Sequence, residues 1–438
     1  MSERHRADAP DEKHDRPSTK DGRFRYYLRR AGPGLVTGAA NDDPGAIGTH
    51  AQVGAQFGTA TFWLAPYTVP ITAVVLEMCA QIGNVTGRGL VTILRFHYPR
   101  WITWAALVLI AGANVINLAA DLGLMAEAVR MLVGGPVLLW LLLLAIACAA
   151  LQVFVAYSTY AKVLKVLALS LLGYVAAAVL IPQDWSAVLR ATFIPHIEWS
   201  ASFLMGIVAV LGTRLSPYAL VWQPAQVVEE DIDGGQHRLT ERIGATHHEI
   251  RATQLDVIAG STVANLVTWA ILVTSASTLH ARGITNVETA TQAAEALKPA
   301  AGNLAYALFA LGILVTGLLA VPVLAGGVAY AAGEALGMRR GLTKSASRAP
   351  GFYGVIVGCI ALAAALNLLR INPVRALVLS QVVNGLVAIP LVLLILLVCN
   401  NRAVMGDETN GPLANVLGWA SFVIIAAAGA AAIWNLGW

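Results

Sequence analysis

Long apolar segments alternate with short polar connections along almost the whole chain. Segments of about 20 apolar residues, long enough to cross a bilayer, recur about eleven times. They lie near residues 33–57, 59–83, 101–131, 136–157, 160–182, 199–223, 253–280, 303–335, 351–369, 375–399 and 413–437. The pattern predicts about eleven transmembrane helices, with an amphipathic helix over 286–301 in an external loop.

Composition supports this interpretation. Hydrophobic residues make up 57% of the 438 residues and charged residues only 12%, against about 25% charged in soluble domains. The chain therefore cannot cover itself with polar surface as an ordinary soluble enzyme does. Residues 1–31 are polar without an apolar period, which predicts a disordered tail. We find no motif of a hydrolase, a zinc enzyme or a nucleotide-binding protein in a suitable context, so we expect no enzyme activity, no cofactor and no nucleic-acid partner.

The distribution of Lys and Arg predicts the orientation in the membrane. Twenty-two of the 29 Lys and Arg residues lie in the tail or in connections on the same side, and six lie on the opposite side. The positive-inside rule then predicts a multi-pass protein of the cell (inner) membrane, with a cytoplasmic N-terminus and an extracytoplasmic C-terminus.

Two predicted spans are interrupted. The first contains Pro44 followed by Gly45, and the sixth contains Pro217, 173 residues later; each forms a five-span unit with the next four spans. Two five-span units that each open with a broken helix predict an all-α, LeuT-type 5+5 inverted repeat. We expect a tail over 1–31, one repeat over 32–183, a second over 184–399, and a cytoplasmic loop with helix 11 over 400–438.

The breaks also predict what binds there. The first half-helix should end near Asn41 with its carbonyls and negative dipole end in the gap. Asp42 and Asp43 add carboxylates, and an acid inside a span is a functional candidate because its burial is costly. Carboxylates with bare carbonyls are typical of a divalent cation site.

The residues around the first break resemble a known family. The stretch Gly34-Leu-Val-Thr-Gly-Ala-Ala-Asn-Asp-Asp-Pro-Gly45 resembles the first helix of the Nramp divalent-metal transporters, whose hallmark there is Asp-Pro-Gly-Asn. Shorter matches continue through Val85-Thr-Gly-Arg-Gly-Leu90, Ala120-Asp121-Leu122, Leu379-Ser-Gln-Val-Val383 and Asn400-Asn-Arg402. The resemblance covers nearly all of residues 33–408.

The resemblance implies a set of metal ligands. The metal would lie between the Asp43 carboxylate and the carbonyl of Ala40 on one side, and the carbonyl of Thr213 and the side chain of Ser216 on the other. Gln381 is implied as a further ligand. Inward movement of the metal is likewise implied by the family alone.

The sequence departs from the family pattern at four positions. Ala46 replaces the motif's Asn, and Ser216-Pro217-Tyr218 replaces the usual Met-Pro-His of the sixth helix. In the third helix Leu124 stands three residues after Asp121, at the position where the family has Glu. A hydroxyl lacks the preference of a thioether for soft metals, so Mg²⁺ or hydrated Mn²⁺ are the expected cations. Proton coupling is left open, with Asp121, Asp42, Arg214 and Tyr218 as the residues of a proton path or gate.

Arg214 is the unexpected residue, because a permanent cation lies beside an expected cation site. It could pair with Asp121, Asp42 or Glu77 as a structural group, act as a gate or counter-ion, or mark a different substrate. We interpret His50 as a hydrogen-bonded interior histidine.

The sequence therefore favours a secondary transporter that moves a divalent cation by alternating access. Its partners would be that cation, membrane lipid and, if transport is coupled, protons, with the protein a monomer or weak oligomer. Two alternatives stay open: a transporter of the same fold for a non-metal solute, and a transport-inactive sensor or scaffold in which Arg214 fills the cation site.

Overall fold

The computed structural model describes residues 42–155, 172–233, 235–244, 247–298, 302–342, 344–369 and 372–436. Within these ranges every regular element is a helix. Nine helical segments there are long and apolar enough to cross a membrane. They are α4 (Leu64–Thr86), α6 (Arg100–Val133), α7 (Val137–Phe154), α11 with α12 (Ala201–Arg214 and Pro217–Asp233), α14 (His247–Thr278), α17 (Ala305–Leu336), α18 (Pro350–Leu366), α19 (Pro373–Cys399) and α21 (Pro412–Leu436).

Two further predicted spans are described only in part. The first contributes α3 (Pro44–Phe57), and the fifth contributes α9 (Leu172–Leu180). The rest of these two spans, and the tail over 1–31, lie outside the described residues. The nine segments together with α3 and α9 agree with the predicted number of about eleven.

Shorter helices connect the spans. They are η1 (Gly58–Thr61), α5 (Leu90–His97), α10 (Trp185–Phe193), α13 (Leu239–Arg242), η3 (His280–Arg282), α15 (Ala290–Glu295), η4 (Gly302–Leu304), η5 (Asn367–Leu369) and α20 (Arg402–Met405). Of the amphipathic helix predicted over 286–301, the described residues contain the six-residue helix α15, and 286–289 are not helical; 299–301 lie outside the described residues. The N-cap of α15, Thr289, accepts a hydrogen bond from the Gln292 N–H, and the helix starts at Ala290, four residues later than expected.

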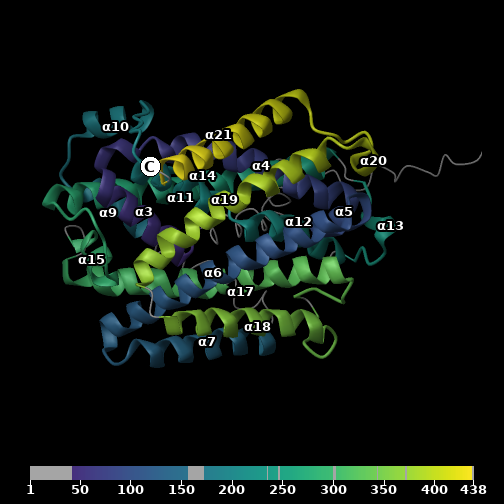
Figure 1. The fold of residues 1–438 in the computed structure, drawn as a ribbon, viewed down its shortest axis with the longest axis horizontal. Coiled ribbons are helices and arrows are strands. Elements are labelled where there is room, and N and C mark those ends of the chain that lie inside the picture. The colour runs from purple at the N-terminus through teal and green to yellow at the C-terminus, as the bar shows by residue number, and fades with distance from the viewer. Residues whose placement is uncertain are drawn as a thin grey trace, which may run out of the picture.

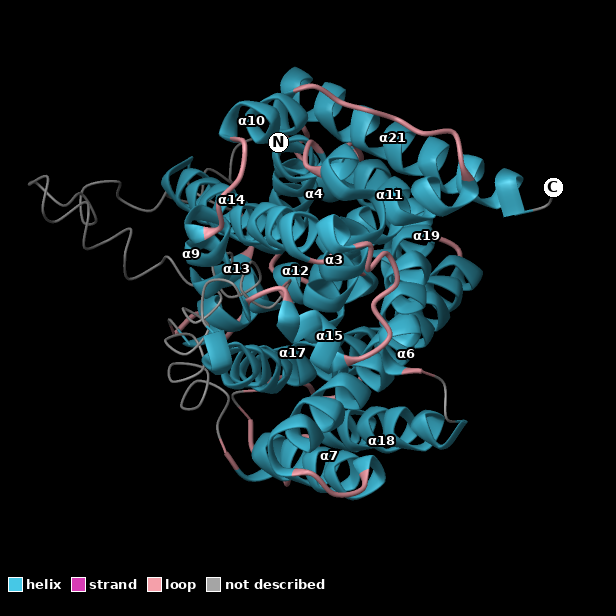
Figure 2. Cartoon of the chain, turned by 90° about the vertical axis from the view of Figure 1, so that its left-hand side faces the viewer, coloured by secondary structure: helices cyan, strands magenta, loops and turns pink. Residues whose placement is uncertain are grey.

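The helices pack side by side with their axes close to one direction (Figure 1). α6 packs against α17, and α7 and α18 form an outer pair on one side of them; α21 lies on the opposite side (Figure 2). Between these outer elements α3 contacts α14 and α19, and α11 contacts α19. The two interrupted helices are therefore central in the bundle.

The distribution of polarity is the reverse of a soluble protein's. Along α7 the exposed side chains are apolar, among them Leu138, Leu142 and Ile146. The interior holds charged and amide groups, including Asp43 and Arg214, each 1% exposed. An apolar surface over a polar interior is stable in a lipid bilayer, where hydrocarbon replaces water as the solvent.

Small residues bring α11 and α19 into backbone contact. A Cβ added at Gly212 would collide with the Gln381 carbonyl, and one added at Gly385 would collide with the Val208 carbonyl. In membranes, helices commonly pack through glycine and other small residues, which let the two backbones approach closely. It places the Gln381 backbone directly against the end of α11, where that helix is interrupted.

Candidate cation site

The first break is fixed by local chemistry at the start of α3. Asp43 is the N-cap, and its Oδ1 accepts the backbone N–H of Ala46 at 2.6 Å. Pro44 occupies the first helical position, where its missing N–H has no consequence for the helix it begins. The positive dipole end of α3 therefore begins at the Asp43 side chain.

The second break separates α11 from α12. α11 ends at Arg214 and α12 begins at Pro217, so Leu215 and Ser216 form the connection. The Ser216 hydroxyl donates to the carbonyls of Gly212, at 2.8 Å, and Thr213, at 3.2 Å. This side chain therefore lies at the open end of α11, among carbonyls that the helix no longer uses.

Each break has a proline, which lacks a backbone N–H. In a continuous helix the carbonyl of residue i accepts the N–H of residue i+4, and proline has none to give. Pro217 thus leaves the carbonyl of Thr213 without its helical donor, and in the sequence Pro44 stands at the same spacing from Ala40. Ala40 itself lies outside the described residues. The family resemblance implies the carbonyls of Ala40 and Thr213 as ligands. Each of these residues has a proline four positions later in the sequence, which cannot donate a helical hydrogen bond to it.

Neutral donors hold the second oxygen of Asp43. Asn117 Nδ2 donates to Asp43 Oδ2 at 3.0 Å, and the Tyr218 hydroxyl lies 3.4 Å from the same oxygen. Gln381 Nε2 in turn donates to Asn117 Oδ1 at 2.8 Å, while Gln381 Oε1 accepts from Asn384 Nδ2 at 2.9 Å. Gln381 therefore reaches the carboxylate through Asn117.

Asp121 approaches the same break from α6. Its Oδ1 accepts the backbone N–H of Gly45 at 2.8 Å, and its Oδ2 is buried without a hydrogen-bond partner. A side chain at position 45 would collide with the Gln381 amide and lie about 3 Å from the Asn117 and Asp121 oxygens. Only glycine fits at this crossing, which explains the Pro-Gly pair.

Arg214 pairs with Asp42. Its Nη2 lies 2.8 Å from Asp42 Oδ1, and both side chains are at most 4% exposed. Arg214 Nε also donates to the Thr213 hydroxyl at 3.2 Å, and His50 Nε2 lies 3.1 Å from that hydroxyl oxygen. The interpretation of Arg214 as a paired group is confirmed for Asp42, and that of His50 as a hydrogen-bonded interior histidine is confirmed as well.

Asn117 was not singled out from the sequence, although a signal was present. Asn114, Asn117 and Asp121 are spaced three and four residues apart in an otherwise apolar helix, so they share one face. A polar stripe on a membrane helix indicates a face turned to the protein interior. Glu77, by contrast, lies outside this group and accepts a hydrogen bond from Gln254.

The described side chains at the break are buried, and a cavity lies near each end of α4. The side chains of Asp43, Ser216 and Gln381 are 0–1% exposed. A cavity of about 620 Å³ is lined by the end of α3 and residues that precede α4, and one of about 390 Å³ is lined by residues that follow α4. The 23 residues of α4 span about 34 Å, so the cavities lie on opposite sides of the break.

The two cavities differ in charge. The larger cavity is lined by the acids Asp184 and Glu198 and, among the described residues, by no Lys or Arg. Hydrogen bonds from the Ser186 hydroxyl and from backbone N–H groups lower the pKa of Asp184, which keeps it ionised. The smaller cavity is lined by five cations, Arg88, Arg242, Arg339, Arg340 and Lys344, against Glu229 and Glu334.

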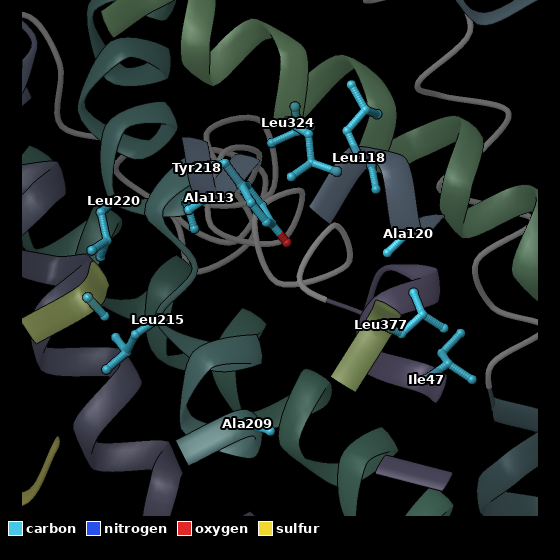
Figure 3. Close-up of a cluster of buried hydrophobic side chains, with 14 of the residues drawn as sticks. Ile47, Ala113, Leu118, Ala120, Ala209, Leu215, Tyr218, Leu220, Leu324 and Leu377 are labelled. Atoms are coloured by element: carbon cyan, nitrogen blue, oxygen red, sulfur yellow. The ribbon is translucent and has the colours of Figure 1, made fainter. Parts of the chain in front are cut away.

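Apolar side chains surround the site. Figure 3 shows part of the buried hydrophobic core, in which Ile47, Leu118 and Leu377 are drawn together with the ring and hydroxyl of Tyr218. In the described part of the chain no three His, Cys, Asp or Glu side chains are gathered so that they could hold a metal together. The oxygen donors at the break are the Asp43 carboxylate, the nearby carboxylates of Asp42 and Asp121, and carbonyl, hydroxyl and amide groups.

Comparison with known structures defines the fold. The manganese transporter of Eremococcus coleocola superposes with a TM-score of 0.72 at 17% identity, over 93% of this chain and 86% of that one. MhsT, solved with L-phenylalanine, gives 0.59 at 12% identity over 92% and 98%. At these identities the likeness shows the fold alone: a LeuT-type transporter fold of all-α membrane architecture.

Sequence comparison gives the family. The family model described as natural resistance-associated macrophage protein-like, Nramp, matches residues 34–435. The divalent metal cation transporter MntH of Deinococcus radiodurans is 27% identical over 94% of this chain and 91% of its own, and that of Pectobacterium carotovorum is 27% identical over 93% and 94%. The chain belongs to the Nramp family.

Proposed function

We propose that this protein moves a divalent metal cation across a membrane by alternating access, with Asp43 as its main charged ligand. The observation that carries the proposal is the position of this carboxylate. It is 1% exposed, caps the half-helix α3 and lies where the two interrupted helices meet. Family membership and the names of the MntH relatives support a metal as the substrate.

The donor set favours a hard cation. The Asp43 carboxylate, the Ser216 hydroxyl and the Thr213 carbonyl offer oxygen atoms. The family resemblance adds the carbonyl of Ala40 and the amide oxygen of Gln381, which are oxygen donors as well. Oxygen donors suit Mn²⁺ and Mg²⁺, and Mg²⁺ keeps several of its waters when it binds. The solved relative is named a manganese transporter, so Mn²⁺ is the first ion to test and Mg²⁺ the second.

The cavities support alternating access and a direction. The buried site requires helix movement before an ion can enter or leave, and the acidic cavity attracts cations while the basic one repels them. The basic cavity's five cations all belong to the side on which 22 of the 29 Lys and Arg residues fall. We therefore assign the acidic cavity to the outside, the N-terminus to the cytoplasm, and inward movement to the ion.

The test is uptake into proteoliposomes. Mn²⁺ and Mg²⁺ uptake is measured for the wild type, for Asp43→Ala and for the control Glu77→Gln, which removes an acid of α4 that bonds Gln254. We expect uptake by the wild type and the control and none by Asp43→Ala. Internal pH, recorded in the same vesicles, reports whether protons accompany the metal. Absence of uptake of either ion by folded wild-type protein would refute the proposal.

One observation favours a second candidate, a transport-inactive sensor or scaffold. The Arg214–Asp42 ion pair places a fixed cation between the two interrupted helices. In such a protein Arg214 would substitute for the metal, and the wild type would bind neither Mn²⁺ nor Mg²⁺. The same measurement separates the two candidates, and flux of an organic solute would point instead to a non-metal transporter.

A further inference from the structure

The two consecutive acids at the first break have different partners. Asp42 forms an ion pair with Arg214, whereas Asp43 accepts hydrogen bonds from the backbone of Ala46 and the amide of Asn117. Adjacent Cα atoms are about 3.8 Å apart, so a cation bound at Asp43 is also within range of the Asp42 charge. Whether that charge is neutralised therefore changes what the site attracts.

The end of α11 and the Thr213 hydroxyl stabilise the charged side chain of Arg214. It is the last residue of α11, where a cation is stabilised by the helix dipole. The Thr213 hydroxyl donates to the Val210 carbonyl at 2.7 Å, so its oxygen is left to accept the Nε–H of Arg214. The guanidinium stays protonated in proteins. The structure thus holds a permanent positive charge against Asp42.

We propose that Arg214 is a specificity-determining residue that sets the charge of the ion the site accepts. By neutralising Asp42, it leaves Asp43 as the net charge of the acid pair, which favours a divalent ion over a trivalent one. This inference rests on the proposed cation transport at Asp43. It assigns to Arg214 an electrostatic action on the bound ion in addition to a structural contact between α11 and the start of α3.

The experiment measures binding of Mn²⁺ and La³⁺ to purified protein by titration calorimetry. Arg214→Gln removes the positive charge, so Asp42 is no longer paired and should attract the bound ion. Both ions then bind more tightly, and the preference for La³⁺ over Mn²⁺ rises by about tenfold or more, since the lost repulsion scales with the charge of the ion. Asp42→Asn removes the negative charge and should shift both affinities and the preference the opposite way.

Two further variants separate charge from structure. The double variant Asp42→Asn/Arg214→Gln loses both charges. Its preference for La³⁺ over Mn²⁺ should lie between those of the two single variants. Arg214→Lys keeps the charge but loses the planar guanidinium, so the La³⁺ to Mn²⁺ preference should stay within about threefold of the wild type. A residue with a purely structural role would give lower binding of both ions in every variant, with no change in preference.

The outcomes are distinct. If the wild type binds no Mn²⁺, the proposed function fails. If it binds Mn²⁺ but Arg214→Gln and Asp42→Asn shift the preference in the same direction or not at all, this inference alone is wrong. Should Arg214→Gln fail to fold, Asp42→Asn is compared with the double variant, since the two differ only in the charge of Arg214. The double variant should then show the higher preference for La³⁺ over Mn²⁺. Should both single variants fail to fold, a changed preference in Arg214→Lys overturns the inference, and an unchanged one supports it.

Discussion

Asn117 positions the carboxylate that we assign to the metal, and Asn117→Leu tests that role. The amide is fully buried, donates to Asp43 Oδ2 at 3.0 Å, and accepts from Gln381 Nε2 at 2.8 Å and from the Ser380 hydroxyl at 3.1 Å. Leucine has a similar size but offers no polar atom. The substitution therefore removes the link between Asp43 and Gln381 without opening a large cavity.

The expected magnitude follows from these bonds. A hydrogen bond to a charged group contributes about 1.5–3 kcal/mol, and a buried donor left unpaired, here the Gln381 amide, costs about 1–3 kcal/mol. Ser380 also donates to the Leu377 carbonyl, so it keeps a partner. If half or more of this loss falls on the orientation of Asp43, the KM for Mn²⁺ rises about tenfold or more, because 1.4 kcal/mol corresponds to a factor of ten.

The assay compares Asn117→Leu with Asn114→Leu in proteoliposome uptake and in thermal unfolding. Asn114 lies one turn away on α6 and donates to the Leu324 carbonyl. We expect both variants to unfold at a lower temperature and only Asn117→Leu to raise the KM. Equal KM values in the wild type and Asn117→Leu, or equal increases in both variants, would refute the positioning role.

Three further outcomes are expected. Gly45→Ala should abolish uptake, because the added methyl group collides with the Gln381 amide; wild-type uptake by this variant would show that the helix crossing is looser than described. Ser216→Met should raise the preference for Cd²⁺ over Mg²⁺ in uptake competition, since a thioether favours soft ions, and an unchanged preference would place this side chain away from the metal. Arg214→Ala should lower the unfolding temperature more than Asp42→Asn/Arg214→Gln, because it leaves a buried carboxylate unpaired at a cost of about 3–5 kcal/mol; the reverse order in thermal unfolding would contradict the pairing.

The sequence by itself determined the architecture and the location of the breaks. Apolar runs of bilayer length specify helices, because in hydrocarbon the backbone must satisfy its own hydrogen bonds. Pro44 and Pro217 interrupt two of these runs through the local absence of an N–H, which no packing can restore. The adjacent Asp-Pro-Gly residues were sufficient to indicate the family.

Tertiary structure decided the partners within the site. From the sequence Arg214 could pair with Asp42, Asp121 or Glu77, and the link from Gln381 through Asn117 to Asp43 was not predicted. Arg214 and Asp42 are 172 residues apart, and Asn117 and Asp43 are 74 apart. Sequence spacing fixes which face of a helix carries a polar group, whereas hydrogen bonds and ion pairs form only within a few ångströms. The rotation and close packing of helices far apart in the chain bring particular atoms within that distance.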